Sequence, residues 1–316
     1  MTNASKQYKQ TMNHHINANK QNMSNKLRSM SDKNPKQYWS YLNKLKPKSK
    51  ITTTPTLEEL QEHFKELNTN TINDNRYNDT NDQSHYTSTT LNSTITKEEI
   101  EKCITNLKNS KTPSPFDNIL NEYIKSTKHL LMPVYCKLFN YILETGFIPQ
   151  SWLNGIIIPI FKNKGDPKDP SNYRPITILS CLGKLFTSIL NNRLTKFLNE
   201  NNILDENQAG FRKGYSCSDH IFTLHSLIEL MKKKKQKLYC AFIDFSQAFD
   251  KVWRIGLWHK LIKQNITGKF LTLVQNMYSN IKSSISLNGN ISKPFISEIG
   301  VRQVENFSPH ILPLPK

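Results

Sequence analysis

Paired cysteines, long apolar runs and a secretory leader are missing from this sequence of 316 residues. The five cysteines lie far apart with no C-x-x-C pair, and the nine histidines have no metal-ligand spacing. This argues against a zinc knuckle or a disulfide scaffold, and favours reduced thiols. No run of about 18 apolar residues exists to cross a membrane, and the N-terminus MTNASKQYKQ has no apolar core. We therefore expect a cytoplasmic or nuclear protein that is not secreted and has no membrane partner.

Acidic residues are scarce as well. The chain has 25 Asp and Glu against 43 Lys and Arg, which gives a net charge of +18. Such an imbalance favours a polyanionic partner, nucleic acid first and an anionic membrane surface second. A basic soluble protein without a nucleic-acid role is the alternative. Hydrophobic residues make up only 36% of the chain, so part of it is expected to contribute little to a core.

Polar stretches divide the chain into regions. Residues 1–67 form a basic N-terminal region, predicted to be largely irregular with short helices, of which Tyr38 to Leu45 is an amphipathic candidate. Residues 68–94 are almost all Asn, Thr, Asp and Ser, which cannot bury enough apolar area to fold, so they are predicted to be a flexible linker.

Apolar periodicity predicts both helices and strands after residue 95. Thr96 and Glu99 have the spacing of a capping box, so a helix begins there. Further helices are predicted over residues 119–146, 182–198, 218–231 and 270–278. Ser218 is the expected N-cap of the third of these, and the lysine run 232–235 closes it. Strands are predicted over residues 152–161, 175–179 and 239–244. Asn288-Gly289 after the alternating residues 281–287 predicts a β-hairpin. The fold class is therefore α+β. For the lysine run, RNA contact or nuclear import is the alternative to a helix-dipole role.

The string YCAFIDFSQAFDKVW, Tyr239 to Trp253, carries the strongest chemical signal. An apolar strand delivers the carboxylate of Asp244 to a strand end, and Phe249 follows five residues later. A polymerase site needs such a carboxylate for Mg²⁺ and an aromatic beneath the incoming nucleotide. The alternative for Asp244 is the N-cap of a helix beginning near Ser246, and a cap is the interpretation preferred for Asp250.

A second carboxylate is not evident downstream. No aspartate occurs between Lys251 and Lys316, where the only acids are Glu298 and Glu305. A two-metal phosphoryl-transfer site needs more than one carboxylate. The sequence therefore shows the first half of such a site.

Four motifs occur in a fixed order, and together they are highly specific. They are IPIFKNKGD (158–166) with NYRPI (172–176), QAGFRKGYS (208–216), FIDFSQAFD (242–250) and GVRQ (300–303). From about Thr96 to Gln303 the chain resembles the reverse transcriptase domain of non-LTR (LINE-like, jockey-like) retrotransposons. The resemblance implies a right-hand polymerase fold, with helical fingers and part of the palm sheet in residues 95–303. It also implies an RNA template, a DNA primer, dNTP substrates and Mg²⁺.

The resemblance implies a role for each motif residue. Asp244 is the first metal-binding carboxylate, and the backbone carbonyl of Phe245 helps to hold Mg²⁺. Phe249 is the residue that blocks a nucleotide 2′-OH, and ordinary packing in the core is the alternative role for its side chain. The cations that bind the triphosphate are Arg174 and either Lys162 or Lys164. The alternative for each lysine is a solvated charge on a loop. Arg212 contacts the template or its backbone, and Gln303 packs near the nascent base pair.

The last motif departs from the family pattern, which continues G-V-R-Q-G. Val304 stands at the glycine, where a β-branched side chain would crowd the nucleotide, and Pro313 and Pro315 would disrupt the helix that follows. Residues 304–316 are thus an aberrant tail, and the palm hairpin with Y/F-A-D-D is missing. We expect a truncated reverse transcriptase that is inactive by itself. A non-catalytic RNA- or DNA-binding module and an unstable product of a decaying element are the alternatives.

Overall fold

The computed structural model describes residues 3–34, 38–40, 42, 54–69 and 88–302, which fall into two compact units, 1–53 and 54–316. The first unit contains helix α1 (Asn3–Lys33) of 31 residues, so the prediction of short helices was wrong here. The physical reason is that no proline or glycine interrupts residues 3–33. Of the stretch Tyr38 to Leu45, residues 38–40 and 42 are helical and the others lie outside the described residues.

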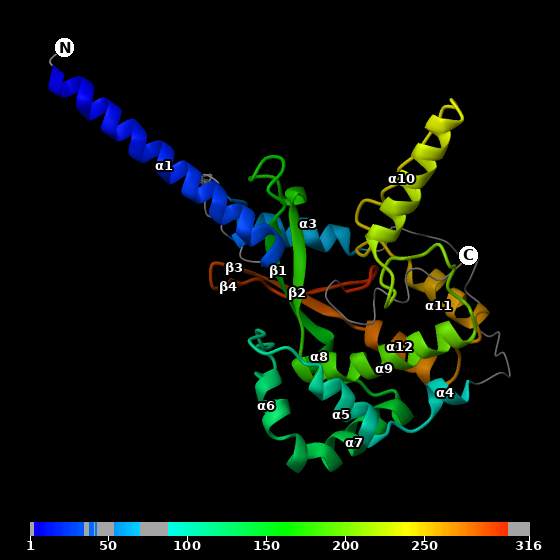
Figure 1. The fold of residues 1–316 in the computed structure, drawn as a ribbon. Coiled ribbons are helices and arrows are strands. Elements are labelled where there is room, and N and C mark those ends of the chain that lie inside the picture. Colours follow the sequence, from blue (N-terminus) through cyan, green and yellow to red (C-terminus); the bar gives the residue numbers. More distant parts are fainter. Residues whose placement is uncertain (1–2, 35–37, 41, 43–53, 70–87, 303–316) are drawn as a thin grey trace. The chain divides into compact units, whose positions relative to one another are not determined.

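The second unit combines one mixed sheet with helices (Figure 1). The strands are β1 (Asn154–Phe161), β2 (Tyr173–Ile178), β3 (Lys282–Leu287), β4 (Asn290–Ile291) and β5 (Phe295–Ile296). β1 pairs antiparallel with β2 and parallel with β3, while β3 also pairs antiparallel with β4 and β5. The predicted hairpin at Asn288-Gly289 is confirmed, because both residues have positive φ, 52° and 87°, between β3 and β4. The mixed helix and sheet content confirms the α+β class.

The helices after residue 88 are α4 (Thr89–Asn92), α5 (Lys97–Thr105), α6 (Asn121–Ser126), α7 (Lys128–Thr145), α8 (Gln150–Leu153), α9 (Cys181–Glu200), α10 (Cys217–Lys233), α11 (Arg254–Lys263) and α12 (Lys269–Tyr278). The bounds of α9, α10 and α12 are close to those that periodicity predicts. The helix predicted over 119–146 is divided into α6 and α7, and α4, α8 and α11 were not predicted. The Thr96–Glu99 capping box and the C-cap at Gly146 are confirmed. Ser216, not Ser218, caps α10, because its hydroxyl accepts from Ser218 N–H and Asp219 completes a capping box.

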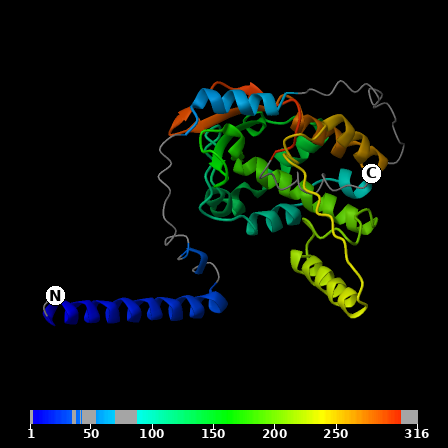
Figure 2. The same cartoon turned by 90° about the horizontal axis from the view of Figure 1, so that it is seen from above.

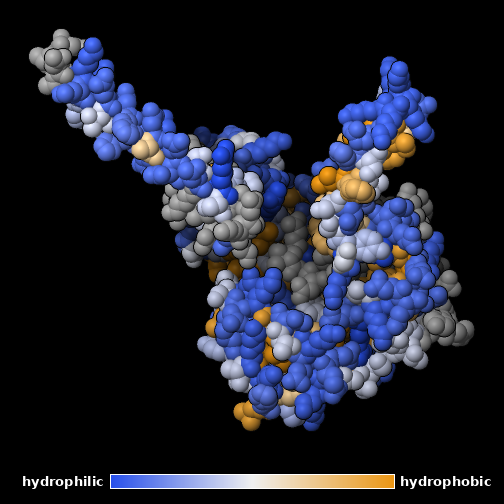
Figure 3. Space-filling view, viewed as in Figure 1, coloured by the Kyte–Doolittle hydropathy of each residue, from blue (hydrophilic) through white to orange (hydrophobic). Residues whose placement is uncertain are grey.

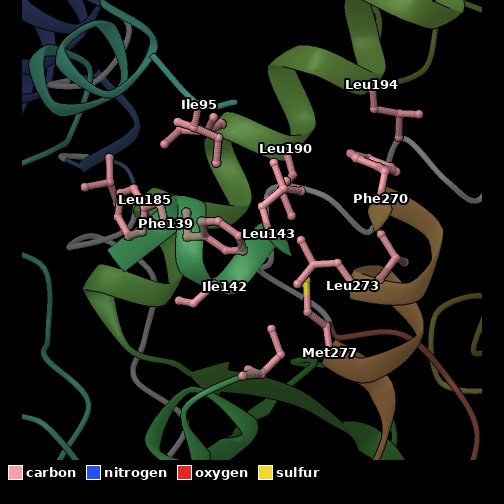
Figure 4. Close-up of a cluster of buried hydrophobic side chains, with 14 of the residues drawn as sticks. Ile95, Phe139, Ile142, Leu143, Leu185, Leu190, Leu194, Phe270, Leu273 and Met277 are labelled. Carbon is pink, nitrogen blue, oxygen red and sulfur yellow. The ribbon is translucent and has the colours of Figure 1, made fainter. Parts of the chain in front are cut away.

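The main core lies among helices α5, α7, α9 and α12 (Figure 4). Phe139 and Phe186 are fully buried, with ring centroids 5.2 Å apart, and Leu190 and Phe270 are also 0% exposed. Buried Arg193 on α9 closes one side of this core. Its Nε and Nη2 donate to Glu99, each at 2.7 Å, and its other hydrogen bonds go to the backbone carbonyls of Leu91, Ser93 and Thr94. The guanidinium of Arg193 thus holds residues 91–94 against α9, so the end of the predicted linker is ordered.

A second, smaller core joins the sheet to helix α3 (Leu57–Leu67), which lies along β3 (Figure 2). Leu60 and Phe64 of α3 pack with Ile157, Tyr173, Ile285 and Phe295 from the strands. The backbone carbonyl of Asn68, just after α3, accepts from Glu298 N–H at 2.8 Å. Helix α3 is therefore part of the second unit rather than of a separate N-terminal region. The rest of the predicted linker, 70–87, lies outside the described residues.

Candidate functional site

The segment that carries Asp244 differs from its prediction. Residues 236–245 form no strand, and Tyr239, Phe242 and Ile243 are 83–85% exposed. A strand obtains its backbone hydrogen bonds from a neighbouring strand, and none of the described strands pairs with this segment. Asp244 is exposed as well. The prediction of a strand over 239–244 was therefore wrong for this chain, because high apolar content does not replace a pairing partner.

The preceding helix, α10, is exposed in the same way. No residue of α10 is buried, and two of its apolar residues, Ile221 and Phe222, are 67% and 73% exposed. Figure 3 shows hydrophobic side chains on the surface of this helix. Lys232 and Lys233 occupy its last turn, as predicted, and Lys232 forms a salt bridge of 2.8 Å with Glu229. Helix α10 and residues 236–245 together form an arm that makes little contact with the core.

The turn after Asp244 is anchored firmly. Residues 246–251 form turns rather than a helix, and the N-cap of α11 is Trp253, so neither Asp244 nor Asp250 is a helix cap. Val301 N–H donates to the carbonyl of Phe249, and Gly300 N–H donates to that of Val252, both at 2.8 Å. Gly300 has φ 81°, and a Cβ atom there would lie 2.5 Å from the carbonyl oxygen of Asp250. Glycine is therefore required where the two motifs meet.

Phe249 is half-buried at this junction. Its ring lies edge-to-face with that of Phe211, with centroids 6.5 Å apart, and it also packs against the main core. The structure thus brings together Phe249, the QAGFRKGYS loop and the GVR residues of the last motif. Gln303 and Val304 lie outside the described residues. The 2′-OH-blocking role of Phe249 stays a prediction.

Arg254, which the sequence analysis did not single out, ties these motifs in place. Its half-buried guanidinium donates hydrogen bonds to the backbone carbonyl oxygens of Tyr278, Ser297, Ile299 and Gly300, at 2.8–3.0 Å. Burial lowers the pKa of Arg254 to about 10. A single arginine after an aromatic residue gives no signal of this role in the sequence, because its partners are main-chain groups far along the chain.

The predicted triphosphate cations lie on the loop and strand that follow β1. The Nζ of Lys162 donates to Ser171 O at 2.7 Å, while Lys164 and Arg174 are exposed. Asp169 caps the 3-10 turn η2 (Pro170–Asn172), and hydrogen bonds from Ser171 hold the pKa of its carboxyl below the usual range. Arg174 faces Ile160 in the β1–β2 register. The loop is thus fixed by its own hydrogen bonds and presents cations to solvent.

Helix α3 supports this loop at His63. Burial lowers the pKa of His63, and nearby Asp169 partly opposes that shift. The hydroxyl of Tyr173 donates to Pro167 O at 2.7 Å, and its ring belongs to the core beneath α3. This support could not be predicted from the sequence, because α3 precedes the four motifs by about a hundred residues.

Arg212 is held by its own loop. One guanidinium nitrogen donates to Asp205 O at 2.7 Å, and the group lies 4.2 Å from the ring centroid of Tyr215. Its role as a template contact stays a prediction.

Metal-ligating side chains do not cluster in the part of the chain that the structure describes. No three His, Cys, Asp or Glu residues converge there. Within the same ranges, no helix has the length and apolar content to span a membrane.

Comparison with known proteins gives these motifs their context. Residues 162–313 match the sequence model of the family described as "Reverse transcriptase (RNA-dependent DNA polymerase)". The chain is 31% identical over 211 residues to the probable RNA-directed DNA polymerase from transposon BS of Drosophila melanogaster, covering 66% of this chain and 23% of that protein. It is 29% identical over 208 residues to the corresponding protein of transposon X-element in the same organism, covering 65% and 22%.

A third relative belongs to the same group. The RNA-directed DNA polymerase from mobile element jockey of Drosophila funebris is 29% identical over 210 residues, with 66% of this chain and 23% of that protein covered. The chain thus spans less than a quarter of the length of these relatives. The order of the motifs, their junction at Phe249 and Gly300, and these matches agree with one another. The chain therefore carries a reverse transcriptase domain of the kind found in non-LTR retrotransposons.

Proposed function

We propose that residues 95–303 supply the fingers and part of the palm of an RNA-directed DNA polymerase, which copies an RNA template by extending a DNA primer with dNTPs. The observation that carries this proposal is the backbone pairing of Phe249 and Val252 with Val301 and Gly300. It joins two motifs about 50 residues apart at one point, with the Phe211 loop beside them.

In this proposal the β1–β2 loop binds the triphosphate. Lys162, Lys164 and Arg174 offer positive charge near a loop that is already fixed, which suits phosphoryl transfer because that reaction depends on positioning and charge neutralisation. Phe249 excludes the 2′-OH of a ribonucleotide, and Gln303 packs near the nascent base pair. Arg212 contacts the template strand.

The described residues do not fit a complete magnesium site. Asp244 offers one exposed carboxylate, and no group of three metal-ligating side chains is present among the described residues. Magnesium prefers several oxygen ligands, and two-metal catalysis needs more than one carboxylate. We propose Asp244 and the carbonyl of Phe245 as two ligands of a Mg²⁺ site that is completed by carboxylates other than those described.

Primer extension tests this proposal. Residues 1–316 are compared with a fusion in which a relative's palm and thumb segment follows Gln303, using an RNA template, a DNA primer, Mg²⁺ and dNTPs. We expect no extension by residues 1–316 and extension by the fusion. In the fusion, Asp244→Asn should abolish extension, whereas Glu206→Gln, a change at another exposed acid, should not.

Two outcomes would contradict the proposal. Extension by residues 1–316 above the level of their Asp244→Ala variant would show that one carboxylate is enough. An active fusion that tolerates Asp244→Asn would remove Asp244 from the metal site.

The absence of a complete metal site among the described residues favours a second function, which is binding of RNA or DNA without chemistry. Binding requires only cations and weakens steeply with salt. A salt titration of RNA binding by residues 1–316, set beside the extension assay, separates the two functions. Salt-dependent binding without extension by either the chain or the fusion favours the binding module.

A further inference from the structure

Three phenylalanines meet at one pocket beside the motif junction. The pocket has a volume of about 530 Å³ and is lined by Phe211, Phe245 and Phe249, together with residues of the turn 246–248, Gln208, Gly210 and Lys251. Phe211 is 59% exposed and Phe245 is 77% exposed, so their rings are available to a ligand. Exposed aromatic rings that gather around an open pocket are typical of sites that stack flat ligands.

The backbone on two sides of this pocket is strained. Phe211 has φ 60° and Gln247 has φ 58°, values that place both residues in the left-handed region. A bulky aromatic residue adopts this conformation at a cost, and glycine would adopt it without one. Strain of this kind persists where the surrounding structure or a function requires the side chain. Because Phe211 is more than half exposed, burial of its ring gives little compensation.

One lysine lines the pocket, and two cations follow Phe211 in the chain. The lysine is exposed Lys251, and the two cations are Arg212 and Lys213. Arg212 is fixed by its bond to Asp205 O and by its contact with Tyr215. Aromatic faces beside fixed cations match a single-stranded nucleic acid, whose bases stack while its phosphates meet the cations.

We propose that this pocket takes an unstacked base of the template strand, and that Phe211 is the ring on which the base stacks. The inference rests on the proposed function and deepens it, because it assigns a base-binding residue beside the phosphate contact expected of Arg212. The edge-to-face contact with Phe249 then holds the Phe211 ring in place.

Fluorescence anisotropy on the full chain tests the inference with two labelled probes. One is an oligoadenylate of about 12 nucleotides, and the other is an abasic strand of the same length and charge. Phe211→Ala should weaken oligoadenylate binding by about 5- to 150-fold, since base stacking on an aromatic ring is worth about 1–3 kcal/mol. Abasic binding and the salt slope should stay unchanged, because the phosphate contacts remain.

Two further variants separate stacking from general effects. Phe211→Trp should keep the oligoadenylate affinity within about threefold of wild type, because it keeps an aromatic face. Phe222→Ala, at a 73% exposed ring of α10 that does not line the pocket, should change neither affinity. Phe211→Gly relieves the backbone strain and loses the Phe249 contact, so its melting temperature should stay within about 2 °C of wild type while binding falls.

The inference is overturned if Phe211→Ala leaves oligoadenylate affinity unchanged, or weakens both probes equally. A clear loss of melting temperature in Phe211→Gly would show that the ring serves folding and would also overturn it. A wild-type chain that binds neither probe contradicts the proposed function itself, whereas a chain that binds both probes equally contradicts only the base-stacking inference.

Discussion

Strand β3 and residues 236–245 are both rich in apolar side chains, yet they have opposite environments. Ile285 of β3 is 0% exposed, and its strand has neighbours in β1, β4 and β5. Ile243 is 83% exposed, and its segment pairs with no described strand. An apolar segment therefore forms a strand only where a neighbouring strand supplies backbone hydrogen bonds and other elements bury one of its faces.

The same contrast divides the candidate site. The carbonyl of Phe249 accepts a backbone hydrogen bond from Val301, and Arg254 bonds the carbonyls of Ser297, Ile299 and Gly300, so the junction of the two motifs is fixed. Asp244, only five residues earlier, is exposed and lacks a sheet around it. A catalytic carboxylate must be held to within about 0.5 Å, which an unpaired segment does not achieve.

The largest expected difference between the two regions concerns the unfolding of phenylalanine variants. Phe139→Ala removes a fully buried ring and should destabilise the second unit by about 3–5 kcal/mol. Phe242→Ala, at an 85% exposed ring of the arm, should change stability by less than about 0.5 kcal/mol. Urea unfolding followed by circular dichroism measures both. Similar losses in the two variants would mean that the arm packs on the core in solution.

Arg254→Lys tests how much the guanidinium of Arg254 stabilises the junction of the two motifs. Lysine keeps the charge but lacks the planar fork that reaches four carbonyl oxygens, so we expect a loss of about 2–3 kcal/mol. Arg174→Lys, at an exposed residue of β2, is the matched control and should be nearly neutral. The same urea titration compares them, and an equal effect would refute the assignment of Arg254 as a fork.

Two glycine variants test how the motifs meet. Gly289→Ala suffers only from its left-handed backbone, because nothing lies within 4 Å of the added methyl group. Gly300→Ala has similar φ and also meets the carbonyl oxygen of Asp250 at 2.5 Å. We expect Gly300→Ala to cost about 1–2 kcal/mol more in thermal unfolding. Equal costs would mean that residues 249–252 do not dock on Gly300.

The smallest effect is expected from pH. Burial raises the pKa of Glu99, but hydrogen bonds from Arg193 and from Thr96 N–H outweigh it, so the folded pKa lies below the ordinary 4.5. The resulting stability is present above that ordinary value and is lost as pH falls through the lower folded pKa. The advantage of wild type over Glu99→Gln in urea unfolding, on the order of 1 kcal/mol near pH 7, should therefore shrink in acid. An advantage that grows in acid would contradict this sign.

Features set by neighbouring residues could be predicted from the sequence. The Thr96–Glu99 capping box, the Asn288-Gly289 turn and the helix over 181–200 each depend on contacts within a few residues. The resemblance implies that Phe249 and Gln303 serve one site; the structure brings Phe249 to Val301, and Gln303 lies outside the described residues.

Features set by distant partners could not be predicted. The strand over 239–244 had the right composition, but its partner is not among the described strands. Arg193 and Arg254 donate mainly to main-chain carbonyls, which carry no signature in the sequence. Helix α3 contributes to the sheet through Leu60 and Phe64, whose spacing indicates a helix but not what it covers.

The main conclusion is that this chain pairs strands β1–β5 in one sheet and leaves the segment of Asp244 without a partner among the described strands. Hydrogen–deuterium exchange of residues 1–316 tests it most directly by comparing the amides of β1 with those of residues 238–245. We expect the amides of β1 to exchange slowly, because they belong to a hydrogen-bonded ladder with β2 and β3. We expect residues 238–245 to exchange at nearly the rate of an unfolded peptide. Equal protection of the two segments would contradict the account.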